Sequence, residues 1–453
     1  MRLRKVILIT IDSLRADCSA PLMASIQKRL GKVINRIIFA NGPGTPQSFP
    51  AILASSSFLL LNPDFTVPEY MITLPEILSK HNFITVGIHS NPYLSHAFGW
   101  HKGFKIFYDH FDEISTPTFS IVKSKTLRRI LSMLMKSRRI GTKILPRLRK
   151  FYQLLIALRA SKPPYIDAKD ITDTALNVLN SYRYSKLFLW VHYMDTHWPY
   201  NIPDDKLANE CKFDTSKQAL KFLYKIPISF TVTEERTLSI DKHTLEKMIC
   251  LYRMSVTYVC KNVEKLLVSL KELDLLDESL IILTGDHGEA FLEHGELGHP
   301  FHTLYNENLL VPLIIWHPYL QGLNSGNVTP IQLREIPAFI LNALNIKMPI
   351  PWAKTTLSKH LIFAESAYVH PADMLIDKNK YIIAVTDKKY KLILDKIKER
   401  VELYDLEKDP SERNNIVNHN EDIANDLLRS IEKYRLTLSI PYKIHHKIYQ
   451  RTS

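Results

Sequence analysis

Short runs of apolar, often β-branched residues alternate along the first 350 residues with segments of helical periodicity. Five runs have the length and composition of buried strands: 5–11, 83–89, 187–192, 280–284 and 311–316. Apolar positions recur every three to four residues, as in amphipathic helices, at 74–80, 171–182 and 245–273. Strands that alternate with helices predict an α/β fold, with a mainly parallel sheet sandwiched by helices.

The pattern changes after about residue 360. Residues 381–385 and 390–394 are short apolar runs separated by a lysine-rich turn, and an amphipathic helix is predicted near 423–434. We therefore expect a large domain over residues 1–360 and a small α+β subdomain over 361–453.

The positive charge of the chain is concentrated in one segment. The 453 residues carry 59 lysines and arginines against 46 acids, a net charge of +13. Residues 123–162 hold 13 of the cations and no acid, so the rest of the chain is balanced. This distribution argues against a protein that coats nucleic acid with a uniformly basic surface, and no nucleic-acid-binding motif is present.

The basic segment predicts a helical insertion at about 115–165. Leu127, Ile130, Leu131 and Leu134 form an apolar stripe, and basic residues lie elsewhere on the helix, at Arg128, Arg129, Lys136 and Arg138. Such a helix is typical of a segment that binds an anionic membrane surface. Two alternatives stay open: the stripe packs on the large domain, or the cations steer an anionic substrate to its site.

Cysteine usage and the N-terminus indicate the compartment. Cys18, Cys211, Cys250 and Cys260 lie far apart, which argues against a disulfide scaffold and favours a reducing environment. The first apolar run has only about six residues before Asp12, short of the roughly 7–15 of a signal-peptide core. We expect a cytoplasmic protein, peripheral at the membrane if the basic segment binds one.

Acidic and imidazole side chains follow three of the predicted strands. Asp12 follows the first strand, Asp195 and His197 follow the strand at 187–192, and Asp286 and His287 follow the strand at 280–284. The carboxyl ends of parallel strands share one edge of a sheet, where ligands bind. Each acid alone is most simply a helix cap. Three such strand ends together favour a metal site.

Residues 41–53 predict a loop that enters a helix, with Pro46 or Pro50 in the first turn. A hydroxyl at Thr45 would face free backbone N–H groups and the positive end of the helix, which suits a phosphate or sulfate. The simpler alternative is that Thr45 or Ser48 only caps the helix. The sequence contains no GxGxxG, GxxxxGK[ST], HExxH or GxSxG motif.

These segments resemble the sulfatase branch of the alkaline phosphatase superfamily, in the same order along the chain. The similar segments are 9–17, 44–55, 192–200, 284–299 and 402–415. The resemblance implies an alkaline-phosphatase-like fold and a divalent metal held by Asp12, Thr45, Asp286 and His287. It also implies that Thr45 is the nucleophile and that His197 holds anionic oxygens of the substrate. His299, which stands where sulfatases usually have a lysine, is expected to share that role.

Several positions depart from the sulfatase pattern. Ser13 replaces a second acid, Gln47 replaces a proline, and Phe49 replaces an arginine. Thr45 cannot give the formylglycine that sulfatases make from Cys or Ser, because its β-carbon carries a methyl group. Relatives that act on phosphate esters use an unmodified Thr or Ser, so chemistry at phosphorus is favoured.

The number of metal ions stays open. Relatives with two metals place a His four residues after a strand-end Asp, but Pro199 stands at that spacing from Asp195. Asp195 with His299 or His302 could form an irregular second site, and we expect one metal. An imidazole among oxygen ligands is compatible with Mn, Zn or Ca and weakly favours the transition metals.

The sequence thus predicts a metal-dependent hydrolase of sulfate or phosphate esters that uses a Thr nucleophile. Two alternatives remain. The same site could transfer a phosphoryl group to a lipid or glycan hydroxyl at a membrane surface, because the second step differs only in the acceptor. A non-catalytic protein that binds polyanions through its basic segment is the other alternative, although the retained Asp12, Thr45, Asp286 and His287 argue against it.

Overall fold

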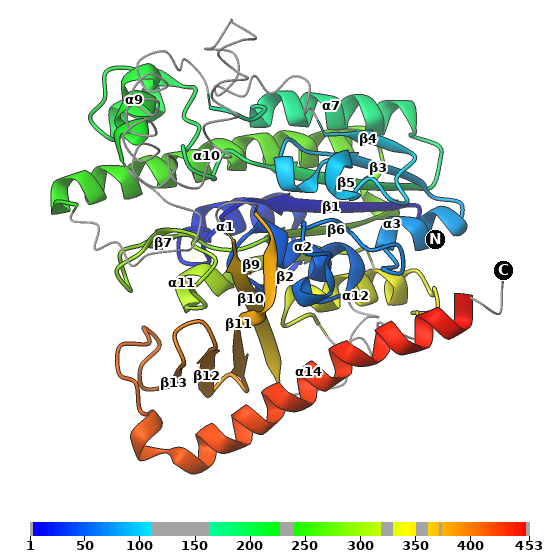
Figure 1. Ribbon diagram of the computed structural model, residues 1–453. Helices are drawn as coiled ribbons and strands as arrows, with labels where there is room; N and C mark the ends of the chain where they lie inside the picture. The colour runs from blue at the N-terminus through cyan, green and yellow to red at the C-terminus, as the bar shows by residue number, and fades with distance from the viewer. Residues whose placement is uncertain are drawn as a thin grey trace, which may run out of the picture.

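The computed structural model describes residues 3–109, 163–226, 240–318, 329–349, 361–370 and 374–449, with side chains to residue 438. Its centre is a seven-stranded sheet in the order β2-β9-β6-β1-β5-β3-β4 (Figure 1). The strands are β1 Lys5–Ile11, β2 Ile34–Phe39, β3 Ile84–Ile88, β4 Ile106–Tyr108, β5 Leu187–Tyr193, β6 Ser279–Gly285 and β9 Leu310–Trp316. All five predicted strands are present.

The sheet is parallel at its centre and antiparallel at one side. β1 pairs in parallel with both β5 and β6, and β3 pairs in parallel with β4 and β5. β9 pairs antiparallel with β6 and with the edge strand β2. Ile11 lies opposite both Tyr193 and Gly285, so the residues that follow β1, β5 and β6 emerge at the same edge. This register positions the site described below.

Helices cover both faces of the sheet, as predicted for a sandwiched α/β fold. The helices are α1 Ala20–Leu30, α2 Thr45–Ala54, α3 Leu74–Lys80, α7 Ala168–Ser181, α8 Asp205–Glu210, α9 Ser216–Lys225, α10 Lys242–Glu272, α11 Asn306–Leu309, α12 Ile336–Ala343 and α14 Glu421–Tyr449. Single 3-10 turns occur at Phe58–Leu60, Pro92–Leu94, His96–Phe98, Leu276–Glu278, Leu333–Glu335 and Val417–His419. α1, α7 and α10 pack on one face, and α2, α3 and α12 pack on the other.

β1 shows why the sheet needs cover on both sides. Val6 and Leu8 pack with α2 and α12, whereas Ile7 and Ile9 pack with α1, α7 and α10. Every residue of β1 is buried. A strand buried on both faces has a continuous apolar sequence rather than an alternating one, which is what the sequence of β1 shows.

The C-terminal part adds an antiparallel sheet of four strands, with α14 running across it (Figure 1). Its strands are β10 Ile362–Val369, β11 Ile376–Thr386, β12 Tyr390–Asp395 and β13 Arg400–Asp405. β10 contacts α2 and the 3-10 turn that follows it: Ser366 accepts a hydrogen bond from Gln47 Nε2 of α2 at 3.4 Å, and buried Glu365 accepts one from Phe58 N at 3.0 Å. Glu365 also pairs with Arg334 at 3.2 Å. The small sheet therefore supports the helix that begins at Thr45.

The structure contains one disulfide that the spacing of the cysteines did not predict. Cys211, at the end of α8, forms a disulfide with Cys250 of α10. Folding brings these two residues together although 39 positions separate them. Cys18 and Cys260 carry free thiols.

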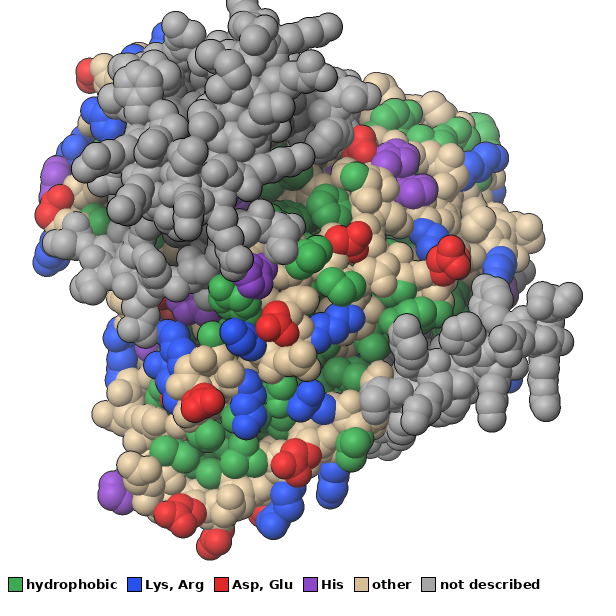
Figure 2. Space-filling model, viewed as in Figure 1, with side chains coloured by type: hydrophobic (Ala, Val, Ile, Leu, Met, Phe, Trp, Pro, Cys, Tyr) green, Lys and Arg blue, Asp and Glu red, His purple; other side chains and the backbone are tan. Residues whose placement is uncertain are grey.

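Figure 2 shows one face of the molecule. Among the described residues on that face, acidic and basic side chains are interspersed and form no single basic region. This agrees with the charge balance of the chain outside residues 123–162. Residues 115–162 of the predicted basic insertion lie outside the described residues, and its membrane-binding role stays a prediction. Within the described residues, no helix combines the length and the apolar character needed to cross a membrane.

Candidate active site

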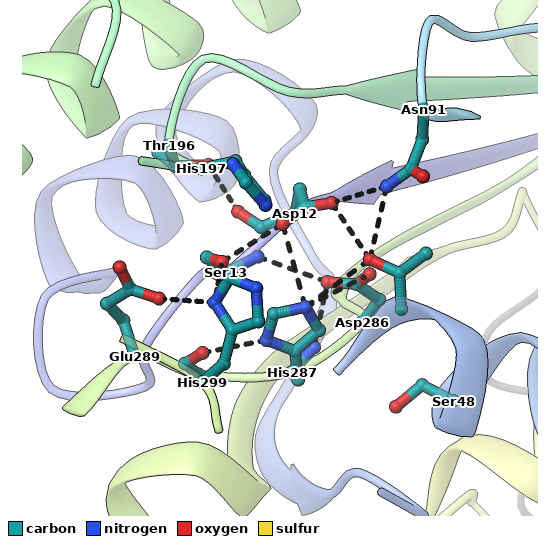
Figure 3. A network of polar contacts seen from close by, with 12 residues as sticks. Asp12, Ser13, Ser48, Asn91, Thr196, His197, Asp286, His287, Glu289 and His299 are labelled. Atoms are coloured by element: carbon teal, nitrogen blue, oxygen red, sulfur yellow. Dashed lines mark hydrogen bonds and ion pairs between the residues drawn. The ribbon is translucent and has the colours of Figure 1, made fainter. Parts of the chain in front are cut away.

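Three side chains that follow neighbouring strands meet at the carboxyl edge of the sheet (Figure 3). Asp12 follows β1, and Asp286 and His287 follow β6. His287 Nε2 lies 3.6 Å from Asp12 Oδ1 and 3.6 Å from Asp286 Oδ2. Candidate ligand atoms of the three buried residues lie within 4.8 Å of one another. The fold thus brings together the residues expected to ligate one metal ion.

The chemistry of this cluster fits a divalent cation. Asp286 Oδ2 is buried and has no hydrogen-bond partner among the described residues. Burial and the Asp12 carboxylate raise the pKa of Asp286 well above its usual range. Burial also disfavours the charged form of Asp12. Three nearby imidazoles have the larger combined effect and hold the pKa of this carboxyl well below its usual range: those of His197, His192 and His287. A cation would offset the repulsion between the two carboxylates.

Thr45 turns its hydroxyl toward this cluster from the first position of α2. The N-cap is Gly44, and no side chain caps the helix, so the alternative that Thr45 or Ser48 serves only as a cap is wrong. Thr45 Oγ1 donates a hydrogen bond to Asp12 Oδ2 at 3.0 Å and lies 3.4 Å from His287 Nε2. The hydroxyl is therefore placed to join the ligand set.

Asn91 is a site residue that the sequence analysis missed. Its Nδ2 donates to Asp12 Oδ2 at 3.0 Å and to Thr45 Oγ1 at 3.2 Å. It comes two residues after the predicted strand 83–89, so the strand-end argument applied to that strand would have found it. Its amide places a hydrogen-bond donor beside the candidate nucleophile.

The two histidines expected to hold anionic oxygens lie beside the cluster. The rings of His197 and His299 are 4.9 Å apart, and those of His287 and His299 are 4.5 Å apart. His197 Nδ1 lies 2.5 Å from the Trp198 carbonyl oxygen. The structure thus brings both residues together with the metal-ligand candidates.

Ser13, which stands where sulfatases have a second acid, connects the two carboxylates. Its hydroxyl donates to Asp12 Oδ1 at 2.9 Å, and its backbone N–H donates to Asp286 Oδ1 at 3.1 Å. The residue adopts a left-handed conformation with φ 54°, which turns the chain sharply after Asp12. Ser13 therefore positions the acids without adding a third negative charge.

Phe49, which stands where sulfatases have an arginine, is part of an aromatic wall behind the site. Its ring centroid lies 5.3 Å from that of Trp190 and 5.2 Å from that of His192. His192, which the sequence analysis did not single out, is buried with Nε2 3.4 Å from Asp12 Oδ2. Phe49 therefore makes apolar contacts at the position where the family pattern has a guanidinium.

Gly288 lets the chain after β6 pass close to another segment. A Cβ atom at this position would lie 1.9 Å from the Glu307 carbonyl oxygen. We expect Gly288→Ala to lower the free energy of unfolding by about 3 kcal/mol or more, because the backbone at residue 288 or at Glu307 must move to make room for the Cβ atom. Urea unfolding checks this, with Gly31→Ala as the control. Gly31 has open space and φ +76°, so that change should cost only about 1 kcal/mol.

Asp195 and His302, the candidates for a second metal, lie outside the three-residue cluster. Asp195 Oδ1 accepts hydrogen bonds from Ala168 N at 3.1 Å and from Asn201 Nδ2 at 2.8 Å. His302 Nε2 lies 3.0 Å from a carboxylate oxygen of Glu296. These contacts tie Asp195 to the start of α7 and to the loop after β5, and a second metal stays a prediction.

Asp195→Asn should stabilise the protein more at pH 8 than at pH 5. Burial and Asp167 raise the pKa of the Asp195 carboxyl to about 8. When the pKa of a carboxyl is raised by folding, the protein loses stability as pH rises from the pKa of the unfolded state, about 4, through the pKa of the folded state. Asn mimics the protonated form and removes this loss, on the order of 3 kcal/mol. Urea unfolding at both pH values, beside Asp277→Asn on the surface, measures it; equal gains at both pH values would contradict it.

Comparison with known proteins places this geometry in a family. The Sulfatase family model matches residues 4–343. Arylsulfatase K of Mus musculus is 23% identical over 299 residues, which are 58% of this chain and 53% of that protein. An arylsulfatase of Clostridium perfringens is 28% identical over 193 residues, 40% of this chain and 38% of that protein. The chain thus spans about half, or less, of the length of these relatives.

Solved structures share the fold over almost the whole chain. A phosphonate monoester hydrolase of Agrobacterium radiobacter has a TM-score of 0.65 at 13% identity, with 96% of each chain covered. A protein in complex with its substrate, D-glucosamine-2-N,6-O-disulfate, has a TM-score of 0.66 at 15% identity, with 97% of this chain and 98% of that one covered. With the family model matched over residues 4–343, this chain belongs to the sulfatase family.

Proposed function

We propose that this protein is a metal-dependent hydrolase of anionic esters, with Thr45 as its nucleophile and phosphorus as the favoured centre of reaction. The observation that carries the proposal is the position of the Thr45 hydroxyl, which is hydrogen-bonded to Asp12 and Asn91 beside Asp286 and His287. The sulfatase family and its neighbours, named as sulfatases and phosphonate monoester hydrolases, support the reaction class.

The residues present support a reaction in two steps. Thr45 Oγ1 forms a bond to phosphorus as the bond to the leaving alkoxide breaks; the Thr45 proton, directed at Asp12 Oδ2 from the start, leaves Oγ1, and the alkoxide takes up a proton from solvent. Water then attacks the same phosphorus, the bond between phosphorus and Thr45 Oγ1 breaks, and a proton from the water returns to Oγ1. A divalent cation held by Asp12, Asp286 and His287 would lower the pKa of the Thr45 hydroxyl and offset charge on the transferred group.

Side chains around Thr45 can hold the oxygens of the ester. Asn91 Nδ2 donates to Thr45 Oγ1 at 3.2 Å and to Asp12 Oδ2 at 3.0 Å, so it orients the nucleophile toward the bound ester. His197 and His299 line the opposite side, beside the ring of His287. A group bound between them would have its reacting atom close to Thr45, which converts attack into an intramolecular step.

A substrate panel tests this function. Purified protein is incubated with p-nitrophenyl phosphate, bis-p-nitrophenyl phosphate, p-nitrophenyl phenylphosphonate and p-nitrophenyl sulfate, each with Mn²⁺, Zn²⁺ or Ca²⁺ or with a chelator. We expect metal-dependent release of nitrophenol, faster from a phosphorus ester than from the sulfate. Turnover of the sulfate alone would contradict the preference for phosphorus, and no turnover of any ester would contradict the proposed activity.

A further inference from the structure

Glu289 is a buried acid beside the site that the proposed reaction does not yet use. It lies between β6 and β7 (Ala290–Phe291), and its side chain is fully buried. Its backbone is held on both sides: the N–H donates to the Glu307 carbonyl at 3.1 Å, and the carbonyl accepts from Arg15 Nη1 at 2.7 Å. These two hydrogen bonds fix the backbone that carries the carboxylate.

The carboxylate of Glu289 contacts one of the candidate substrate-binding histidines (Figure 3). Oε2 lies 2.7 Å from His299 Nδ1, and Oε1 accepts a hydrogen bond from the Tyr200 hydroxyl at 2.9 Å. His299 comes directly after β8 (Leu297–Gly298), and Tyr200 lies in the loop after β5. Three separate segments thus converge on one carboxylate.

The hydrogen bonds around His299 Nδ1 determine which ring nitrogen carries the proton. Ser13 Oγ lies 3.3 Å from Nδ1, but the Ser13 hydroxyl donates its hydrogen to Asp12 Oδ1 at 2.9 Å. Ser13 Oγ therefore faces Nδ1 as an acceptor, and the ionised Glu289 carboxylate presents Oε2 as a second acceptor. Two acceptors around Nδ1 require an N–H there, as an imidazole oriented by a carboxylate normally shows.

The other side of the ring faces the nucleophile. A Cβ atom at Gly44, the residue before Thr45, would lie 3.7 Å from His299 Cδ2, the carbon bonded to Nε2. The ring also packs between those of His197 and His287. With Nδ1 directed at Glu289, Nε2 is the nitrogen directed toward the substrate.

We propose that Glu289 is a positioning residue for His299: it fixes the ring and the Nδ1–H tautomer, so that Nε2 meets the substrate. This rests on the proposed function, because it assigns a partner to a residue of that site. A lysine, which sulfatases usually have at the position of His299, has no tautomer and needs no such acceptor.

A double-mutant cycle tests the proposal on the metal-loaded enzyme. Glu289→Gln keeps the size of the side chain but cannot accept from both Tyr200 and His299. We expect kcat to fall about tenfold or more, with KM and the calorimetric Zn²⁺ affinity changed less than about threefold. In a His299→Ala background the same change should have little further effect. If the fold-loss of kcat in the double variant equals the product of the losses in Glu289→Gln and His299→Ala, the proposal is overturned.

A spectroscopic measurement separates this proposal from the proposed function. ¹⁵N-histidine NMR of the Zn²⁺-loaded protein, with the His299 signals assigned by their loss in His299→Ala, reports the tautomer without turnover. We expect the proton on Nδ1 in the wild type and a shift toward Nε2 in Glu289→Gln. A wild-type proton on Nε2 alone would overturn the positioning role even if esters are hydrolysed. The expected tautomer with no hydrolysis would contradict the function alone.

Discussion

Thr45→Ala is expected to reduce ester hydrolysis by about a thousandfold or more, because it removes the atom that forms the bond to phosphorus. The fold should survive: Thr45 is the first residue of α2, and Ala is a good helix former. The change also leaves Asp12 Oδ2 and Asn91 Nδ2 without their shared hydroxyl partner. The measurement is kcat/KM on the best ester of the panel.

Thr45→Ser is the matched control, because it keeps the hydroxyl and removes only the methyl group. We expect this variant to keep activity within about a hundredfold of the wild type. Mass spectrometry of acid-quenched wild-type enzyme should also find a phosphoryl group on the peptide that contains Thr45. Equal activity of the wild type and Thr45→Ala on every ester, or a phosphoryl group on another residue, would contradict the nucleophile assignment.

Strand ends explain why much of the fold and site could be predicted. β1, β5 and β6 are buried on both faces, so each is a continuous apolar run that ends abruptly at polar residues. In a parallel sheet those ends align, which is why the sequence alone groups Asp12, Asp286 and His287. Edge strands gave a weaker signal: β2 is half exposed and lacks such a run.

Contacts inside irregular segments could not be predicted in this way. Glu289 and His299 are ten residues apart, with two very short strands between them, and no periodicity relates their side chains. The disulfide between Cys211 and Cys250 depends on how α8 packs against α10, which spacing alone does not determine. The sequence identified the chemical groups, but pairing them required the tertiary packing.

Removing the metal should abolish hydrolysis and also lower the stability of the folded protein. The two carboxylates of Asp12 and Asp286 lie buried beside each other, and a cation that binds only the folded chain stabilises it by mass action. At a free metal concentration 100 times its Kd, the gain is about 2.7 kcal/mol. Thermal unfolding with and without Mn²⁺ or Zn²⁺ measures it, and chelation should reverse it.

Asp286→Asn tests the same cluster and should separate binding from stability. We expect the variant to lose the metal-induced rise in melting temperature and most of its turnover, because one ligand oxygen loses its charge. Without metal, the variant should be at least as stable as the wild type. Burial and Asp12 raise the pKa of Asp286, so the wild-type protein loses stability as pH rises from about 4, and Asn removes that loss.

The sign of this effect distinguishes a metal ligand from a structural acid. If Asp286 mainly supported the fold through its hydrogen bonds from Ser13 N and His287 N, its replacement would destabilise the metal-free protein at every pH. If it serves to bind a cation, the metal-free variant gains stability over the wild type as pH rises, while metal binding is lost. Urea unfolding of both proteins in chelator at pH 5 and pH 8, with calorimetric titration of Zn²⁺, decides between them.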